Sequence, residues 1–254
     1  MMDLGLTGRT ALVCASTGGL GEATARALAA EGARVVVTGR RGDRARAIAA
    51  ELPGATAVEA DLLAPDGVER LVSAAGEADV LVLNGPGPRP GSAAEVGGGD
   101  VAAAVDALVT PHVRLVSRLL PGMRARGWGR VLAIGSSGVA APLPNLALSN
   151  LGRAALAGYL KTLAAEVAAD GVTVNLLLPG RIATDRVARL DAAAAEREGR
   201  SAAEVEAASR ATIPAGRYGR PDEFGRVAAF LCGEPASYIT GTALRCDGGL
   251  VRTL

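Results

Sequence analysis

The stretch CASTGGLG, residues 14–21, decides the fold because of what stands on either side of it. It overlaps the end of an apolar run, residues 10–15, whose composition predicts a buried β-strand. It then opens a segment in which apolar residues recur at helical spacing up to Gly32, a residue typical of a left-handed helix C-cap. A strand that passes through a glycine turn into a helix predicts the first half of a β-α-β unit.

Strand-like and helix-like segments alternate through the rest of the chain. β-Branched and apolar runs predict further strands at residues 34–39, 56–61, 80–84, 130–135, 172–178 and 243–247. Helical stretches fill the gaps, including long ones at residues 101–126 and 150–170, the second followed by the capping residue Gly171. This alternation implies right-handed crossovers and a parallel sheet. We therefore expect one α/β domain over residues 1–254, a Rossmann-type fold with a doubly wound seven-stranded parallel sheet and helices on both faces.

Two segments break the simple alternation. Residues 85–99 are rich in glycine and proline, and they follow a predicted strand, where doubly wound folds place ligand-binding loops. Residues 185–213 are helical, rich in alanine and glutamate, and followed by Pro214. We expect this second segment to be an insertion beside the site that acts as a mobile lid. Neither segment has the character of a linker that would divide the chain into two domains.

Composition excludes several classes of partner. The net charge is +1, and the arginines are scattered, whereas a nucleic-acid partner needs a concentrated basic face. The three cysteines lie far apart without a C-x-x-C pair, which argues against a disulfide framework or a metal site. Two of them, Cys14 and Cys246, fall in apolar runs and are predicted to be buried free thiols.

The chain also lacks the signals of membrane insertion and export. No window holds about twenty uninterrupted apolar residues, and the first residues have no basic stretch followed by an apolar one. These features predict a soluble cytoplasmic protein that acts on a small molecule. The abundance of alanine, glycine and arginine is typical of a bacterial source with high GC content.

The glycine turn has the features of a nucleotide site. Phosphate binding needs free backbone N–H groups at a helix N-terminus and a turn that allows close approach, and Gly19 and Gly21 meet these needs. The second strand ends in TGRR, residues 38–41, with no acidic residue for the ribose 2′-hydroxyl of NAD. Arg40 could instead pair with the 2′-phosphate of NADP, which favours NADP(H) over NAD(H). A solvated arginine after a strand is the alternative.

Several motifs in order give the chain a resemblance to a known family. The turn matches T-G-x-x-x-G-x-G with Cys14 and Ala15 as departures, and LNGP at residues 83–86 stands where the family has N-N-A-G. PGRIAT at residues 179–184 matches P-G-x-I-x-T, and DGG at residues 247–249 matches the closing segment. The whole chain resembles the short-chain dehydrogenase/reductases, above all their 3-oxoacyl-carrier-protein reductase branch. The resemblance implies these cofactor-binding residues: Ser16, Thr17, Gly19, Leu20, Gly21, Arg40, Asp61, Leu62, Asn84, Gly85, Arg153, Pro179, Gly180, Ile182 and Thr184.

The same alignment shows that most of the family's catalytic tetrad is replaced. Ser136 matches the family's serine, but Ser149 stands at the tyrosine position and Arg153 at the lysine position. Leu108 falls at the tetrad asparagine, and Lys161, the only lysine, lies two helical turns past Arg153. A serine hydroxyl is a far weaker acid than a phenol, and an arginine above pKa ~12 does not exchange protons near neutrality. The candidate catalytic residues are therefore Ser136, Ser149 and Arg153.

Three functions remain open from the sequence. The first is an NADP(H)-dependent oxidoreductase for a small carbonyl or alcohol, with a degenerate tetrad and positioning in place of the usual acid. The second is non-redox chemistry on the same fold, namely elimination, cyclisation or isomerisation, with Arg153 holding an anionic substrate. The third is a catalytically silent nucleotide-binding protein. Arg89 and Arg181 hint at an anionic substrate, although solvated arginines would explain them equally well.

Three further residues and the assembly complete the expectations. His112, the only histidine, lies one turn after Leu108 and is either a proton shuttle or a packed helix residue. Trp128 precedes a strand at the far end of the sheet and is interpreted as structural. In the resembling family the two long helices pair across subunits, which implies a homodimer or homotetramer.

Overall fold

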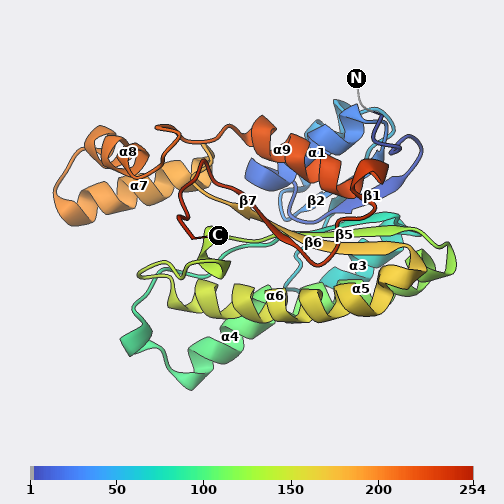
Figure 1. The fold of residues 1–254 in the computed structure, drawn as a ribbon, viewed down its shortest axis with the longest axis horizontal. Helices are drawn as coiled ribbons and strands as arrows, with labels where there is room; N and C mark the ends of the chain where they lie inside the picture. The colour runs from blue at the N-terminus through green and yellow to red at the C-terminus, as the bar shows by residue number, and fades with distance from the viewer. Residues whose placement is uncertain (1–2, 254) are drawn as a thin grey trace.

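Seven parallel strands form one sheet in the computed structural model, which describes residues 3–253 (Figure 1). The strand order is β3-β2-β1-β4-β5-β6-β7. Successive strands are added on one side of β1 up to β3 and on its other side from β4 onward, so the order of addition reverses between β1 and β4. The strands are β1 (Thr10–Val13), β2 (Arg34–Gly39), β3 (Thr56–Glu59), β4 (Val80–Leu83), β5 (Gly129–Ile134), β6 (Val172–Pro179) and β7 (Ala243–Cys246). This is the doubly wound Rossmann-type domain that the sequence predicts, and a ligand crevice is expected where the order reverses.

Helices cover both faces of this sheet in two layers (Figure 1). One face packs against α1 (Gly19–Ala30), α2 (Gly42–Ala50) and α9 (Pro221–Cys232). The other packs against α3 (Gly67–Ala75), α5 (Thr110–Ala125) and α6 (Ala147–Val167). The predicted glycine caps are confirmed, since Gly32 and Gly171 have φ values of 87° and 72°.

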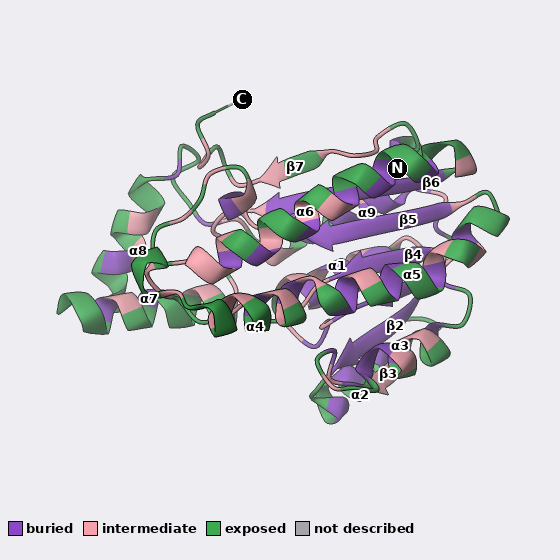
Figure 2. Ribbon diagram, turned by 90° about the horizontal axis from the view of Figure 1, so that it is seen from below, coloured by how far each residue is buried: buried purple, intermediate pink, exposed green. Residues whose placement is uncertain are grey.

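Burial follows position in the sheet (Figure 2). Every residue of β4 and β5 is buried, whereas no residue of the edge strands β3 and β7 is. A central parallel strand is covered on both faces, which is why these sequences are continuous apolar runs and not alternating ones. Cys14 is buried as predicted, but Cys246 is only half-buried because it lies on the edge strand β7.

The long helix predicted over residues 101–126 is in fact two helices. α4 (Gly98–Leu108) ends before Val109, which has φ −119° and ψ −60°, and α5 begins at Thr110. Pro111 explains the break, because it has no N–H to donate to the carbonyl of Ala107 and its ring crowds that carbonyl. The prediction missed a proline signal that the sequence contains.

The segment predicted as a lid is helical. It contains α7 (Asp185–Glu198) and α8 (Ala202–Ala211), which together project from one end of the sheet (Figure 1). Most of its residues are exposed or half-buried (Figure 2). Thr184 accepts a hydrogen bond from the Val187 N–H and so caps the start of α7.

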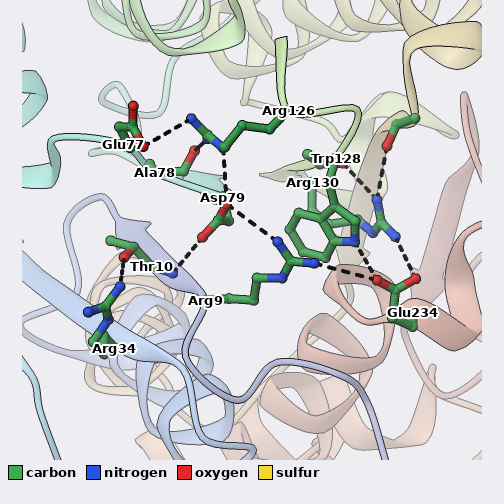
Figure 3. A network of polar contacts seen from close by, with 12 residues as sticks. Arg9, Thr10, Arg34, Glu77, Ala78, Asp79, Arg126, Trp128, Arg130 and Glu234 are labelled. Carbon is green, nitrogen blue, oxygen red and sulfur yellow. Dashed lines mark hydrogen bonds and ion pairs between the residues drawn. The ribbon is translucent and has the colours of Figure 1, made fainter. Parts of the chain in front are cut away.

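A charged network closes the opposite end of the sheet, at the amino ends of the strands (Figure 3). The Trp128 ring lies between the guanidinium groups of Arg9 and Arg130, which are 3.9 and 4.3 Å from its centroid. Glu234 accepts the indole N–H of Trp128 and pairs with both arginines. Trp128 therefore joins the start of β5 to the segment after α9, far from the glycine turn, as the structural interpretation requires.

Candidate active site and nucleotide crevice

The glycine turn after β1 is packed too closely for side chains. A Cβ on Gly21 would lie 2.4 Å from the Ala15 carbonyl oxygen, so the helix can meet the turn only with glycine there. Gly19 has φ 56°, a left-handed conformation that glycine adopts without strain. Ala15 is left-handed as well, with φ 47°, although it carries a side chain.

The N-terminus of α1 leaves donors free for an anion. The first helical bond runs from the Glu22 N–H to the Gly18 carbonyl, so the N–H groups of residues 19–21 have no partner within the helix. Such groups bind phosphate. A Cβ on Gly19 would lie 3.7 Å from the Thr184 methyl group, which makes Thr184 the opposite wall of the crevice. A dinucleotide diphosphate fits these residues.

A groove continues from this turn along the outside of α1. Its volume is about 1060 Å³, and it shares Gly19 and Thr184 with the crevice. It then runs between α1 and the start of α9 at Pro221. An open, solvent-accessible space therefore lies beside the turn, next to the free N–H groups.

Two predicted cofactor residues hold the turn in shape. Ser16 is fully buried, and its hydroxyl donates to the Val13 carbonyl and accepts from the Thr38 N–H. Asn84 donates from its amide to the carbonyls of Cys14 and Ala15, which joins the end of β4 to the turn. The polar groups of Ser16 are thus occupied within the protein, and its part in the site is to position the chain.

Several arginines follow β2, although the sequence pattern singled out Arg40 alone. Arg40 is exposed at the end of β2, as a contact for a 2′-phosphate would be. Arg41, which sequence reasoning passed over, donates to the Thr17 carbonyl at 2.5 Å and lies against Gly18. Arg44 is held by the Glu22 carboxylate at 3.1 Å. The local signal for Arg41 was present, because it adjoins Arg40 in the same TGRR stretch.

Other predicted cofactor residues lie at the carboxyl ends of β3, β4 and β6. The Asp61 carboxylate accepts the Leu63 N–H at 3.0 Å, and Leu62 is 3.7 Å from where a Cβ on Gly85 would lie. These residues form the wall on the β3 and β4 side.

On the β6 side, Pro179 ends the strand and the Gly180 N–H donates to the Cys246 carbonyl at 3.0 Å. A Cβ on Gly180 would lie 2.7 Å from the Asp247 Cα, so only glycine at position 180 lets the two segments approach this closely. Ile182 is buried beneath it. The structure therefore brings the PGRIAT segment to the same edge of the sheet as the glycine turn.

The three candidate catalytic residues gather at the end of β5. Arg153 projects from α6 and donates from Nη1 to the carbonyls of Ile134 and Gly135, at 3.0 and 3.1 Å. Its Nε donates to the Ser149 Oγ at 3.3 Å. Ser136 follows β5 and accepts the Gly138 N–H at 3.1 Å. The alignment of Ser149 and Arg153 with the tyrosine and lysine positions thus corresponds to one cluster in space.

The charge on Arg153 is held in unusual surroundings. Burial, and then the charge of Arg186, lower the pKa of Arg153 to about 10. Arg153 remains a cation at neutral pH, and its hydrogen bonds are to neutral oxygens. Arg186 reaches this region from the first turn of α7 and lies over Gly87, a contact for which the sequence holds no local signal.

His112 lies beside the cluster, at the break between α4 and α5. Its Nδ1 is 2.8 Å from the Leu108 carbonyl oxygen, so the ring donates from Nδ1. Its Nε2 is buried without a hydrogen-bond partner and faces Gly85. Burial lowers the pKa of His112 below its ordinary value, which keeps the ring neutral. Leu108 itself packs against Gly152 of α6 and offers no polar side chain to the site.

The other arginines that hinted at an anionic substrate are already paired. Arg181 contacts the buried Asp191 carboxylate at 2.7 Å, and the Tyr218 hydroxyl donates to the same carboxylate at 2.8 Å. Arg89 pairs with Asp100 at 3.4 Å on the surface. Lys161 donates to the Gly241 carbonyl at 2.8 Å and lies away from the Arg153 cluster, as its position two turns on predicts.

Two other features are absent from residues 3–253. No three histidine, cysteine, aspartate or glutamate side chains gather there as metal ligands. None of the helices in that range has the length and apolar character needed to cross a membrane.

The strand order and the glycine turn together define a dinucleotide-binding domain of the Rossmann class. The chain belongs to the short-chain dehydrogenase/reductase family and is an oxidoreductase, since the family model described as enoyl-(acyl carrier protein) reductase matches residues 14–251. Membership confirms the resemblance drawn from the motifs.

Individual relatives agree over the whole length. The 3-oxoacyl-[acyl-carrier-protein] reductase of Aquifex aeolicus is 33% identical, covering 98% of this chain and 100% of the relative. Dehydrogenase/reductase SDR family member 4 of Bos taurus is 35% identical over 96% of this chain and 88% of its own. The crystal structure of L-sorbose reductase from Gluconobacter frateurii with NADPH and L-sorbose has a TM-score of 0.93, with 32% identity and complete coverage of both chains.

Proposed function

We propose that the protein is an NADP(H)-dependent oxidoreductase that interconverts a small carbonyl compound and its alcohol with a degenerate catalytic tetrad. The observation that carries this proposal is the cluster of Ser136, Ser149 and Arg153 at the end of β5, beside the nucleotide crevice. The L-sorbose reductase of similar structure binds NADPH and a small polyol ketone, which supports the same substrate class here.

The proposed preference for NADP(H) rests on charge. TGRR ends β2 without an acid, Arg40 is exposed there, and Arg41 lies one residue further on against the glycine turn. Two guanidinium groups favour a 2′-phosphate, which they can bind through paired N–H donors. The free N–H groups of residues 19–21 would hold the diphosphate, and the PGRIAT segment would line the nicotinamide side.

The proposed division of labour follows from the donors in the cluster. A nicotinamide held in the crevice would supply or accept the hydride. Ser136 donates a hydrogen bond to the carbonyl oxygen of the substrate, and the cation of Arg153 stabilises negative charge that develops there. Neither Ser149 nor Arg153 exchanges a proton readily at neutral pH, so water delivers the proton to the oxygen. Turnover should be slow, because general acid–base catalysis is weakened while the positioning of the substrate remains.

The proposal is tested by titration followed by turnover. NADPH and NADH are titrated by calorimetry, and a panel of ketones and alcohols is then assayed by the absorbance of the reduced cofactor. We expect tighter binding of NADPH than of NADH and measurable hydride transfer. Tight binding without hydride transfer to any compound would favour non-redox chemistry or silent nucleotide binding instead.

A double variant tests the preference for NADPH over NADH. Arg40→Ala combined with Arg41→Ala removes both cations and should weaken NADPH binding by about tenfold or more while changing NADH binding little. Arg34→Ala, an exposed arginine at the start of β2, is the control. Unchanged NADPH affinity in the double variant would remove the 2′-phosphate role.

We also propose that α7 and α8 form a lid and that the protein is a homodimer or homotetramer. The exposed position of α7 and α8 supports the first, and the exposed apolar side chains of Leu151, Ala154 and Ala155 on α6 support the second. Light scattering after size-exclusion chromatography gives the mass of the assembly. A monomer at micromolar concentration would contradict the second part.

A further inference from the structure

Arg153 is a cation held in place by neutral groups. Its Nη1 donates to two carbonyl oxygens and its Nε to the Ser149 hydroxyl, which fixes the guanidinium plane and leaves the Nη2 group for another partner. Among residues 3–253, no carboxylate lies within ion-pair distance of it. A largely buried charge without a counter-ion is costly, and a bound anion removes much of that cost.

Arg186 brings a second cation to the end of the neighbouring strand β4, close enough for its charge to act on Arg153. A Cβ on Gly87 would lie 2.3 Å from its Nη2 and 2.8 Å from its Nη1, so the guanidinium lies over the loop that follows β4. A side chain at position 87 would displace the guanidinium from this place. In the described part of the chain Arg186 also forms no ion pair, whereas Arg181 on the neighbouring segment is neutralised by Asp191.

We propose that Arg153 and Arg186 form a subsite for an oxyanion on the substrate, a carboxylate or phosphate group next to the reacting carbonyl. The inference rests on the proposed function, which places that carbonyl at Ser136. Ser136 and Arg153 share the end of β5, so an anion between the two arginines lies close to the reacting carbon. Two planar guanidinium groups suit an oxyanion, because each presents paired N–H donors.

The cofactor phosphates have other partners. The free N–H groups at the start of α1 and Arg41 lie at the glycine turn, at the end of β1 and β2. Arg153 and Arg186 act at the ends of β5 and β4, across the point where the strand order reverses. The subsite therefore selects the substrate and leaves affinity for the cofactor to the turn.

The test compares ketones with and without an oxyanion. NADPH-loaded protein is titrated with pyruvate against methyl pyruvate, and with dihydroxyacetone phosphate against dihydroxyacetone, with the fluorescence of NADPH as the readout. We expect the charged member of at least one pair to bind about tenfold more tightly than the neutral member. A preference within the first pair assigns a carboxylate, and within the second a phosphate. Equal binding in both pairs overturns the proposal.

The variants locate the effect. Arg186→Gln should remove most of the preference for the charged compound, Arg186→Lys should keep part of it, and NADPH affinity should change less than about twofold. Arg189→Gln, an exposed arginine on the same helix, is the matched control and should change neither. If Arg186→Gln weakens NADPH as much as it weakens the charged ketone, Arg186 is a cofactor contact and the proposal is wrong.

The two proposals fail in different ways. If NADPH does not bind the native protein, the proposed function fails. The subsite is then tested on the protein alone by calorimetry with pyruvate and inorganic phosphate, comparing native protein with Arg186→Gln. Loss of anion binding in the variant supports the subsite, and equal binding overturns it. Circular dichroism and the thermal midpoint check that Arg186→Gln, an exposed position, folds as the native chain does.

Discussion

Ala15 occupies a backbone conformation that favours glycine. Its φ of 47° lies in the left-handed region, and the turn holds it there through the hydrogen bonds of Asn84. A non-glycine residue in this region costs about 1 kcal/mol or more. The strain belongs to the turn on which nucleotide binding is proposed to depend.

Replacing Ala15 by glycine should therefore stabilise the fold. We expect Ala15→Gly to raise the free energy of unfolding by about 0.5–1 kcal/mol, because relief of strain exceeds the added entropy of the unfolded chain. Urea unfolding followed by circular dichroism measures the change. The control is Ala188→Gly in α7, where the same substitution should cost about 0.5–1 kcal/mol. A loss of stability in Ala15→Gly would contradict the account.

His112 should make stability depend on pH. Burial lowers its folded pKa below the ordinary value of 6.5, so the unfolded chain binds a proton that the folded chain does not. Stability contributed by the neutral ring is present above pH 6.5 and is lost as the pH falls from there towards the folded pKa. His112→Asn keeps a donor for the Leu108 carbonyl and removes this titration. Unfolding in urea at pH 7.5 and 5.5 should show a smaller loss for the variant. An equal loss in both proteins would show that other groups are responsible.

The cluster shows what residue-level sequence analysis can and cannot find. Alignment with the family's tetrad named Ser136, Ser149 and Arg153. Helical period places Ser149 and Arg153 one turn apart on α6, whereas the approach of Arg153 to the end of β5 depends on how α6 packs on the sheet. Arg186 was missed because its position depends on how α7 leaves the sheet. Nothing near Gly87 in the sequence signals an arginine almost a hundred residues further on.

At the scale of elements, α4 and α6 meet at a contact that allows only glycine. A Cβ on Gly152 would lie 2.6 Å from the Leu108 Cδ1 and 3.3 Å from the Ala104 carbonyl oxygen. Gly152→Ala should cost about 1–3 kcal/mol by overpacking. Combining it with Leu108→Ala should cost less than the sum of the two single changes, since the clash is then relieved.

Urea unfolding of the four proteins gives the coupling, and the same helix supplies a control. Gly158 is exposed, and nothing lies within 4 Å of a Cβ built on it. Gly158→Ala should therefore stabilise the protein by about 0.5–1 kcal/mol through helix propensity. Additive effects in the Gly152 and Leu108 cycle would contradict the packing account.

Helix α7, part of the proposed lid, has a buried acidic side chain. Asp191 is 5% exposed and joins Arg181 to the Tyr218 hydroxyl. Asp191→Asn weakens both contacts and should lower stability by about 1–2 kcal/mol, since Arg181 is partly exposed and can be solvated.

Hydrogen exchange followed by mass spectrometry should show faster exchange confined to α7 and α8 in Asp191→Asn. Glu198→Gln at the exposed end of α7 is the control and should exchange as the native protein does. Faster exchange across the central strands would mean that Asp191 supports the whole domain instead of the lid.

At the scale of the whole molecule, the sequence was sufficient for the sheet. All seven strands lie within two residues of their predicted bounds. The central strands are buried on both faces and are therefore continuous apolar runs, whereas the edge strands β3 and β7 are less buried. The break at Val109 was missed because helical periodicity continues across it. Burial of Cys246 was overestimated because apolar composition alone does not distinguish an edge strand from a central one.

The two ends of the sheet differ in what they carry: the candidate site lies at one end and a stabilising charged network at the other. The carboxyl end carries the glycine turn, the Ser136, Ser149 and Arg153 cluster, and helices α7 and α8, whereas the amino end is closed by Arg9, Trp128, Arg130 and Glu234 (Figure 3). Substitutions at the amino end should therefore change stability more than substrate choice.

Because arginine replaces lysine almost everywhere, the chain offers chemical modification a single side-chain amine. Lys161 is exposed, and its ammonium group ties α6 to the Gly241 carbonyl just before the edge strand β7. An acylating dye would attach to one known side chain, on α6 beside β7, while leaving every guanidinium intact. Acylation would also remove the ammonium charge that binds the Gly241 carbonyl. The fluorescence of the dye would then respond to a neighbouring subunit that packs against β7.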